Sequence, residues 1–155
     1  MRRRDREITD PADIADILDR GMVCRLGLCR DGEPYVVPIC YGYSGNSLYY
    51  HCAPEGLKLE ILKANPGACF EITVDVRLRP AEKAAAWTMD YRSVIGRGQL
   101  NVVTDPSEKK RGIGLLMEHY SGRTGWAVEE EMLRRTTILR LDIDEITGKA
   151  SGNGD

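Results

Sequence analysis

Three residues close together in the chain, His51, Gly56 and Lys58, have the types and spacing that could bind an anion. His51 lies near the end of the apolar stretch SLYYHC, and Gly56 follows in a short corner. Lys58 falls in the first turn of a helix predicted from about Glu55 to Ala64. The first N–H groups of a helix lack partners within it, and the helix dipole places partial positive charge there. A helix start that carries a lysine therefore suits a phosphate group.

The cysteines and histidines do not form a metal-binding pattern. The five cysteines are Cys24, Cys29, Cys40, Cys52 and Cys69. None of them has the C-x-x-C spacing of a zinc or redox site, and no carboxylate cluster stands at ligand spacing. Each cysteine lies in or beside an apolar stretch, which is typical of reduced thiols packed as small hydrophobic side chains. We therefore expect no metal site.

Length and charge restrict the class of protein. The 155 residues suit one domain, which we place over residues 1–150, with a Gly- and Ser-rich disordered tail over 151–155. The 22 basic and 24 acidic residues give a net charge of -2, which does not favour nucleic-acid binding. No apolar stretch reaches the roughly 18 residues of a membrane span, and the N-terminal arginines do not precede a signal peptide. We expect a cytoplasmic protein without membrane contact.

Apolar periodicity and turn residues predict a chain rich in β-strands. The predicted strands span about 22–29, 35–43, 47–52, 68–75, 91–104 and 136–146, and the predicted helices about 10–21, 55–64, 105–121 and 126–135. The first three strands form a meander that turns at Ser44-Gly45-Asn46, and 76–88 is a long connection with room for a helical turn. Gly96 and Gly98 mark a bend or bulge. Strands and helices do not alternate, so we expect an antiparallel barrel with peripheral helices.

A series of short motifs along nearly the whole chain resembles the flavin-binding split-barrel superfamily, which contains pyridoxamine 5′-phosphate oxidase. The motifs are Val23-Cys24-Arg25-Leu26-Gly27, Pro34-Tyr35-Val36-Val37-Pro38, Leu48-Tyr49-Tyr50-His51-Cys52-Ala53, Gly56-Leu57-Lys58-Leu59, Asn65-Pro66, Cys69-Phe70-Glu71, Tyr91-Arg92-Ser93-Val94 and Gly96-Arg97-Gly98. The branch with nitroimidazole-resistance proteins is the most similar. The chain lacks the Arg-Leu-containing C-terminal segment of true pyridoxamine phosphate oxidases, so we do not expect that oxidation.

The resemblance implies a mainly β protein, an antiparallel split β-barrel that forms a homodimer and binds FMN in a groove between the subunits. The matching cofactor-binding positions are Val37, Pro38, Ile39, His51, Cys52, Ala53, Lys58, Leu59, Arg92, Ser93 and Val94. Lys58 and Ser93 would bind the phosphate, and the backbone from Val37 to Ile39 would pass along the isoalloxazine ring. His51 is the candidate catalytic residue, because family members exist in which the matching histidine faces the flavin.

The implied activity is reduction of a small planar electrophile, such as a nitroaromatic or quinone, with a nicotinamide as electron donor. A second hypothesis is a non-catalytic protein that stores or senses flavin or haem, with His51 as axial ligand. A third hypothesis is that the protein binds a deazaflavin cofactor, whose acidic tail would contact Arg77 and Arg79. Trp87 and Trp126 could shield a flavin edge or serve packing and dimer contacts.

Overall fold

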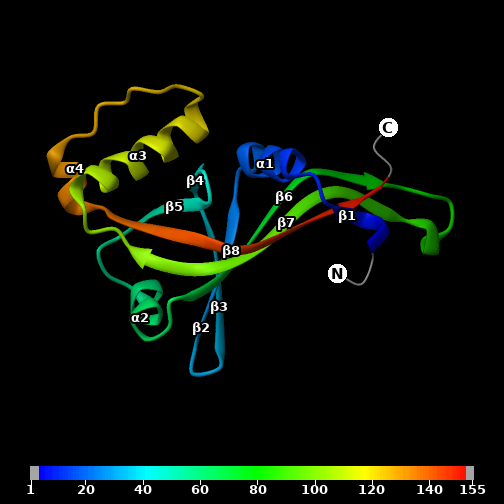
Figure 1. Ribbon diagram of the computed structural model, residues 1–155. Helices are drawn as coiled ribbons and strands as arrows, with labels where there is room; N and C mark the ends of the chain where they lie inside the picture. The colour runs from blue at the N-terminus through cyan, green and yellow to red at the C-terminus, as the bar shows by residue number, and fades with distance from the viewer. Residues whose placement is uncertain (1–3, 153–155) are drawn as a thin grey trace.

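The computed structural model of the chain describes residues 4–152, which fold around one curled antiparallel sheet with helices at its periphery (Figure 1). The strands are β1 (Glu7–Ile8), β2 (Cys24–Arg30), β3 (Glu33–Ile39), β4 (Tyr41–Ser44), β5 (Ser47–Cys52), β6 (Gly67–Arg79), β7 (Thr88–Val102) and β8 (Thr137–Ser151). The helices are α1 (Pro11–Arg20), α2 (Leu57–Ala64), α3 (Pro106–Ser121) and α4 (Glu130–Arg135), with 3₁₀ turns η1 (Arg4–Arg6) and η2 (Ala84–Ala86).

The sheet curls but does not close. Its strands pair in the order β3-β2-β6-β7-β8-β5-β4, and β1 adds to β8. Every pairing is antiparallel. Because β3 and β4 stand at opposite ends of this order, each leaves one edge of the sheet unpaired within residues 4–152. The expected antiparallel split barrel with peripheral helices is confirmed.

Two hydrophobic clusters hold the helices on the sheet. The larger fills the inside of the curl, and there Ile17 and Leu18 of α1 and Ile61 and Leu62 of α2 join the buried strand positions. The smaller lies outside β5 and β8, where Ile113 and Leu116 of α3 pack against Tyr49 and Ile138. Figure 1 shows α3 and α4 gathered over β4 and β5, at the end of the molecule away from the chain termini.

The predicted strand from Tyr35 to Tyr43 is two strands, so the expected three-stranded meander is wrong. β3 pairs with β2 and β4 pairs with β5, and no pairing joins β3 to β4. At the break, the backbone N–H of Tyr41 leaves the sheet and donates to the Tyr120 hydroxyl at 3.1 Å. The apolar pattern runs unbroken through this corner because both strands face the core. The hairpin that turns at Gly45-Asn46 is confirmed, since Ser44 pairs with Ser47.

The long connection predicted over residues 76–88 is mostly strand. β6 continues to Arg79 and β7 begins at Thr88, which leaves a short link that contains η2. The resulting hairpin, residues 75–91, is called the β6–β7 arm and extends beyond the body of the sheet (Figure 1). The register shifts between Val74 and Arg77, where Asp75 has a φ of 57°. Exposed apolar and charged residues alternate there, so no buried face indicated a strand.

The boundaries of α4, of β8 and of the C-terminal tail also differ from the prediction. α4 spans only Glu130–Arg135 instead of 126–135, and β8 runs to Ser151 instead of ending at residue 146. Ser151 is a buried strand residue that pairs with Tyr91, so the tail cannot begin there; residues 153–155 lie outside the described residues. The expected irregularity at the glycines is confirmed by a register shift between Arg97 and Gly98.

Candidate functional site

The corner between β5 and α2, residues 51–58, holds the central residues of the predicted site. Pro54 has no N–H to continue the sheet, and Gly56 turns the chain with a φ of 128°, which favours glycine. The start of α2 has no side-chain cap, whereas Asp10 and Asp105 cap α1 and α3. The first N–H groups of α2 therefore remain available to an external acceptor.

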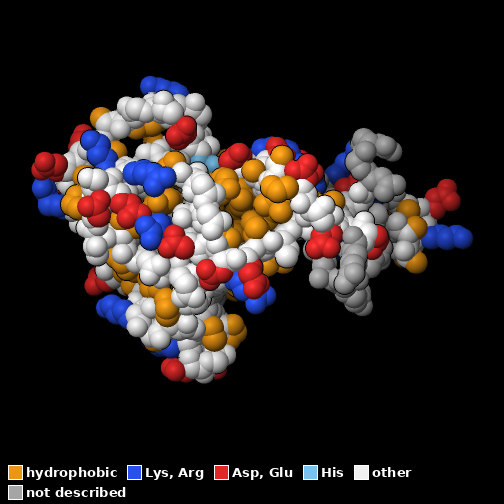
Figure 2. All heavy atoms as spheres, in the orientation of Figure 1, with side chains coloured by type: hydrophobic (Ala, Val, Ile, Leu, Met, Phe, Trp, Pro, Cys, Tyr) orange, Lys and Arg blue, Asp and Glu red, His pale blue; other side chains and the backbone are white. Residues whose placement is uncertain are grey.

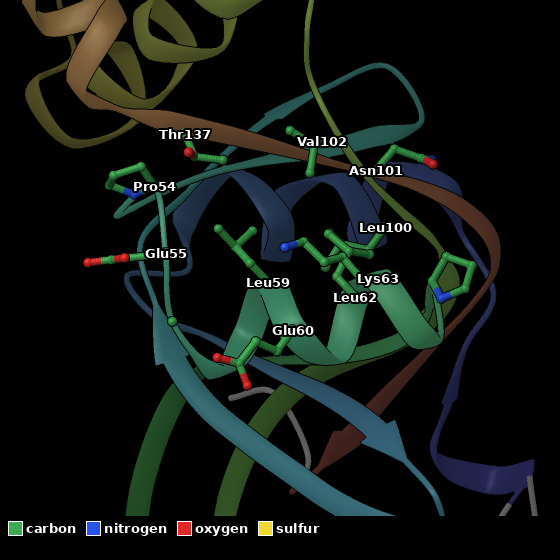
Figure 3. Close-up of a pocket in the computed structure, with 12 residues that line it drawn as sticks. Pro54, Glu55, Leu59, Glu60, Leu62, Lys63, Leu100, Asn101, Val102 and Thr137 are labelled. Carbon is green, nitrogen blue, oxygen red and sulfur yellow. The ribbon is translucent and has the colours of Figure 1, made fainter.

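Lys58 provides an unpaired ammonium at this corner. Its side chain is half-buried, and no carboxylate of the described chain lies within 4.0 Å of it. Burial raises the pKa of the neighbouring Cys52 thiol, and the positive charge of Lys58 partly offsets that increase. Glu55 is exposed, and Figure 3 shows its carboxylate pointing away from the pocket beside α2. Lys58 is therefore a cation free to meet an anionic ligand.

His51 is exposed and lies on the outer side of β5, where it pairs in register with Ile138. Its imidazole makes no hydrogen bond or ion pair within residues 4–152. The second histidine, His119, is bound by contrast: its Nε2 lies 2.7 Å from the carbonyl oxygen of Gly21, and its ring contacts Tyr41. The structure leaves His51 available for a ligand and gives His119 a structural role.

The β3 residues come to the same end of the barrel as the β5–α2 corner. Cys24 pairs with Ile39, and its Sγ lies 3.6 Å from the hydroxyl of Tyr50, the residue before His51. Val37 and Ile39 pack against the main core, as do Cys52 and Leu59, while Pro38 points outward and is exposed. Ala53 is exposed where the corner leaves β5. β3 is an edge strand, so one row of its backbone N–H and C=O groups is not used by the sheet.

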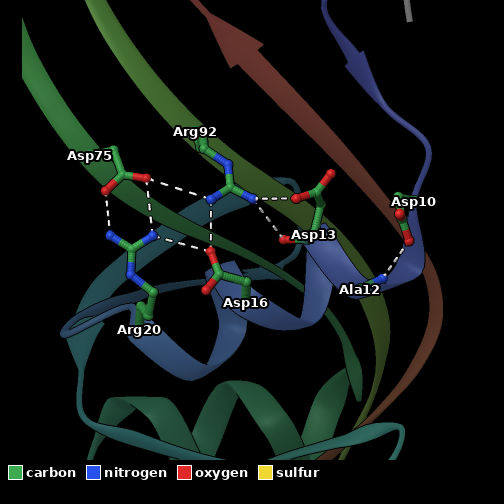
Figure 4. A network of polar contacts seen from close by, with 7 residues as sticks. All are labelled: Asp10, Ala12, Asp13, Asp16, Arg20, Asp75 and Arg92. Carbon is green, nitrogen blue, oxygen red and sulfur yellow. Dashed lines mark hydrogen bonds and ion pairs between the residues drawn. The ribbon is translucent and has the colours of Figure 1, made fainter. Parts of the chain in front are cut away.

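The three predicted cofactor-binding residues of β7, which are Arg92, Ser93 and Val94, lie in different environments from the residues of the corner. Arg92 donates to Asp13 and Asp16 at 3.0 and 2.7 Å, in the network drawn in Figure 4. Ser93 is buried and pairs with Thr73 and Lys149. Val94 is fully buried in the main core. Within one protomer, Arg92 is thus occupied by α1 carboxylates and Val94 is a packing residue, so neither adds a free donor to the corner.

A pocket of about 500 Å³ lies beside α2 (Figure 3). It shares Gly56 and Leu59 with the predicted site, and Lys63, Asn101 and Thr137 add polar groups to its wall. Neither His51 nor Lys58 lines it. The pocket therefore adjoins the predicted phosphate position without containing it.

Cys40 and Tyr120 are two residues beside His51 that the sequence did not indicate as site residues. Cys40 lies in the corner between β3 and β4, next to Tyr41, which pairs with Tyr50. The Tyr120 hydroxyl donates to the carbonyl of Met22 at 3.0 Å and accepts from the Tyr41 N–H. Tyr120 belongs to α3, about 70 positions from His51 in the chain, and nothing in the spacing indicates that the two residues line one cavity. Burial raises the pKa of Tyr120 to about 12.

Two kinds of structural feature are absent from the part of the chain that the structure describes. Residues 4–152 contain no group of three or more His, Cys, Asp or Glu side chains arranged to hold a metal ion. No helix among those residues has the length and apolar character to cross a membrane.

The family model described as Pyridoxamine 5′-phosphate oxidase matches residues 10–150. The chain therefore belongs to this family, whose fold is the flavin-binding split barrel seen here. A curated relative, an uncharacterized protein of Rhizobium meliloti (strain 1021), is 41% identical over 56 residues, which cover 36% of each protein. The match thus spans about a third of that relative's length.

Two solved structures resemble the chain over nearly its full length. One, from Bacteroides thetaiotaomicron VPI-5482 and proposed to be a 5-nitroimidazole antibiotic resistance protein, has a TM-score of 0.82 and 28% identity, and covers 93% of this chain and 86% of its own. The other, the FAD and haem binding protein from Mycobacterium smegmatis, has a TM-score of 0.84 and 26% identity, with 96% and 74% covered. The chain belongs to a family with flavin-binding members.

Proposed function

We propose that the protein is an oxidoreductase that binds FMN, with the phosphate held at the β5–α2 corner. The observation that carries the proposal is the ammonium of the half-buried Lys58, which is unpaired within residues 4–152 and lies in the first turn of a helix without a side-chain cap. A phosphate carries about −1.5 to −2 charges at neutral pH and accepts hydrogen bonds on three oxygens. Lys58 and the N–H groups of Gly56 and Leu57 match that chemistry.

The unpaired edge of β3 supports a position for the ring. The backbone of Val37 to Ile39 can bond the polar edge of a flat heterocycle, while Pro38 covers its face. When bound, the flavin supplies the electron transfer, and the protein binds and orients it. His51 then provides an imidazole that can hold a proton or bond an oxygen of the substrate. The proposed substrate is a small planar electrophile, such as a nitroaromatic or quinone, with a nicotinamide as donor.

Two lysines of α2 give a matched test of the phosphate position. Changing Lys58→Ala removes a charge-assisted contact worth about 1.5–3 kcal/mol, so FMN affinity should fall about tenfold to hundredfold. Lys63→Ala should change FMN affinity by less than about twofold, because Lys63 lines the pocket of Figure 3, which does not contain the predicted phosphate position. Fluorescence quenching of FMN measures both. If Lys63→Ala lost affinity and Lys58→Ala did not, the phosphate position would be wrong.

The same titration with FAD in place of FMN distinguishes the two flavins. The Mycobacterium smegmatis neighbour binds FAD and haem, and the pocket beside α2 begins at Gly56. We propose FMN because the predicted contacts between protein and cofactor end at the phosphate. A much higher affinity for FAD than for FMN would make FAD the proposed cofactor, with the rest of the dinucleotide bound beyond the phosphate.

We also propose that two copies of the chain share the flavin groove. A shallow apolar hollow of about 720 Å³ lies on the outer face of β3, β2, β6 and β7. Figure 2 shows hydrophobic side chains exposed near the middle of the molecule, below α1 in this view. In the hollow itself, Val36 is 66% and Ile95 57% exposed. A second copy would cover this surface. Sedimentation of an Ile95→Lys variant should show a monomer with weakened FMN binding; a wild-type monomer that binds FMN fully would contradict the shared groove.

A non-catalytic haem protein is the second candidate, because the His51 imidazole is free to act as an axial ligand. Adding haem to the protein would then produce a Soret band that is lost in His51→Ala. If FMN binds and no such band forms, the oxidoreductase proposal stands.

A further inference from the structure

A cavity of about 320 Å³ lies beside His51, on the outer side of β5, and is separate from the pocket at α2. β5 contributes His51 to its wall, the corner between β3 and β4 contributes Cys40, and the residue before β8 contributes Thr136. α3 contributes Leu116, Met117 and Tyr120, and α4 contributes Met132. Its volume is at the lower end of the range of about 300–1,000 Å³ that small-molecule sites occupy. The cavity arises only because α3 and α4 are packed over the end of β5.

The wall of this cavity selects for a neutral, apolar ligand. No Asp, Glu, Lys or Arg stands among the described residues that line it, so a charged ligand would lose its hydration without gaining an ion pair. Leu116 is buried, while Met117 and Met132 add two flexible thioethers. Thioether sulfur makes favourable contacts with aromatic rings and adapts to their shape. The lining therefore suits a flat aromatic ring system.

The polar groups that line the cavity can fix the orientation of such a ring. The Tyr120 hydroxyl is already engaged with Tyr41 and Met22, so it has little capacity left for a ligand. His51 has no partner within the described chain, and its imidazole can donate to or accept from one oxygen. The cavity thus combines an apolar body with a few directional polar groups, the His51 imidazole and the Thr136 hydroxyl among them, the usual composition of a specific small-molecule site.

We propose that this cavity binds a small neutral aromatic molecule that carries one oxygen substituent, with the oxygen bonded to His51. Its role as the site of the electron acceptor rests on the flavin proposal above, but the binding itself does not, because every lining residue belongs to this one chain. The cavity adjoins the Val37–Ile39 backbone through Cys40, which places an occupant next to the proposed ring position.

The test uses 2-naphthol as the probe and flavin-free protein, with isothermal titration calorimetry as the readout. Its charged analogue, 6-hydroxynaphthalene-2-sulfonate, should bind at least tenfold more weakly. Met132→Trp enlarges a side chain that lines the cavity and should weaken 2-naphthol binding at least tenfold. Met89→Trp is the matched control, since Met89 on the β6–β7 arm is 44% exposed and Met132 is 43% exposed. Absence of 2-naphthol binding, or equal binding by both tryptophan variants, would overturn the proposal.

Two further measurements separate the cavity from the flavin site. His51→Ala should weaken 2-naphthol several-fold while circular dichroism shows an unchanged fold. FMN-saturated protein should still bind 2-naphthol; displacement by FMN would make the cavity part of the flavin site and overturn a separate acceptor site. If the protein binds FMN but not 2-naphthol, this inference is refuted and the proposed function is not. If it binds 2-naphthol but not FMN, the proposed function is refuted and the binding of an aromatic ligand in the cavity is not.

Discussion

The polar groups around α1 and those at the β5–α2 corner follow opposite patterns. At α1, Arg92 is bound to Asp16 and His119 to the carbonyl that follows the helix. At the corner, His51 and Lys58 have no such partner among residues 4–152. A polar group whose bonds are made within the chain stabilises the fold, whereas one without partners costs little to recruit for a ligand. Residue type alone does not separate the two roles, since each region contains a histidine and a cation.

We call the first region the α1 seam: α1 together with the side chains that bond to it or to the residue after it, which are Tyr41, Asp75, Arg92 and His119. Figure 4 shows its charged part, where Arg20 and Arg92 lie between Asp16 and Asp75. If the two regions differ in this way, changes in the α1 seam should lower the stability of the fold, whereas changes at the corner should not.

The largest effect on stability should come from the Tyr41 hydroxyl. It is fully buried and donates to the carbonyls of Leu18 and Gly21 at 2.7 and 3.0 Å. Tyr41→Phe leaves both acceptors without this donor and should lower the free energy of unfolding by about 1–3 kcal/mol. Urea denaturation measures the change. Tyr43→Phe is the control and should change stability little, because the hydroxyl of the half-buried Tyr43 makes no hydrogen bond within residues 4–152.

The two histidines provide the most direct comparison. His119→Ala removes the bond to Gly21 and the ring contact with Tyr41, which should lower the free energy of unfolding by about 1 kcal/mol. His51→Ala should change the free energy of unfolding by less than about 0.5 kcal/mol, because the exposed ring has no partner to lose among residues 4–152. Urea denaturation of both variants at one pH gives the difference. Equal losses would remove the distinction between a structural and an available histidine.

The charged part of the α1 seam should make stability fall in acid. Hydrogen bonds from Arg92 and Arg20 lower the pKa of Asp16, and chiefly Arg20 lowers that of Asp75. These carboxylates ionise at lower pH in the folded chain than in the unfolded one, so their stabilisation is complete above the ordinary Asp value of 3.8. It is lost as the pH falls through the lowered values.

Asp75→Asn should therefore reduce the loss of stability below pH 3.8, with a small effect because Asp75 is partly exposed. Thermal melts at several pH values measure the slope. Asp144→Asn, at an exposed carboxylate without an ion pair in the described chain, should leave the slope unchanged. Identical slopes for all three proteins would assign acid sensitivity to groups outside the α1 seam.

Local patterns were sufficient where a structural element depends on its own neighbours in sequence. Asp10 and Asp105 indicated the starts of α1 and α3, and both side chains accept the bonds expected of a cap. The Gly45-Asn46 turn and the irregularity at Gly98 were also predicted. The strand from Tyr35 to Tyr43 was predicted wrongly although each half pairs with a strand next to it in sequence. The bond that marks the break, from the Tyr41 N–H to the Tyr120 hydroxyl, joins residues far apart in the chain, and no local pattern indicates it.

The sequence by itself determined the family, the β-rich antiparallel fold and the helix start that carries Lys58. These depend on periodicity, turn residues and short motifs, which are local properties of the chain. Only the tertiary structure decided that Arg92 is bound by α1, that His119 is bonded to Gly21 while His51 has no partner within residues 4–152, and that α3 and α4 enclose a cavity beside His51. Those facts depend on contacts between residues about 70 or more positions apart, and no spacing in the sequence records which distant side chains the curled sheet brings together.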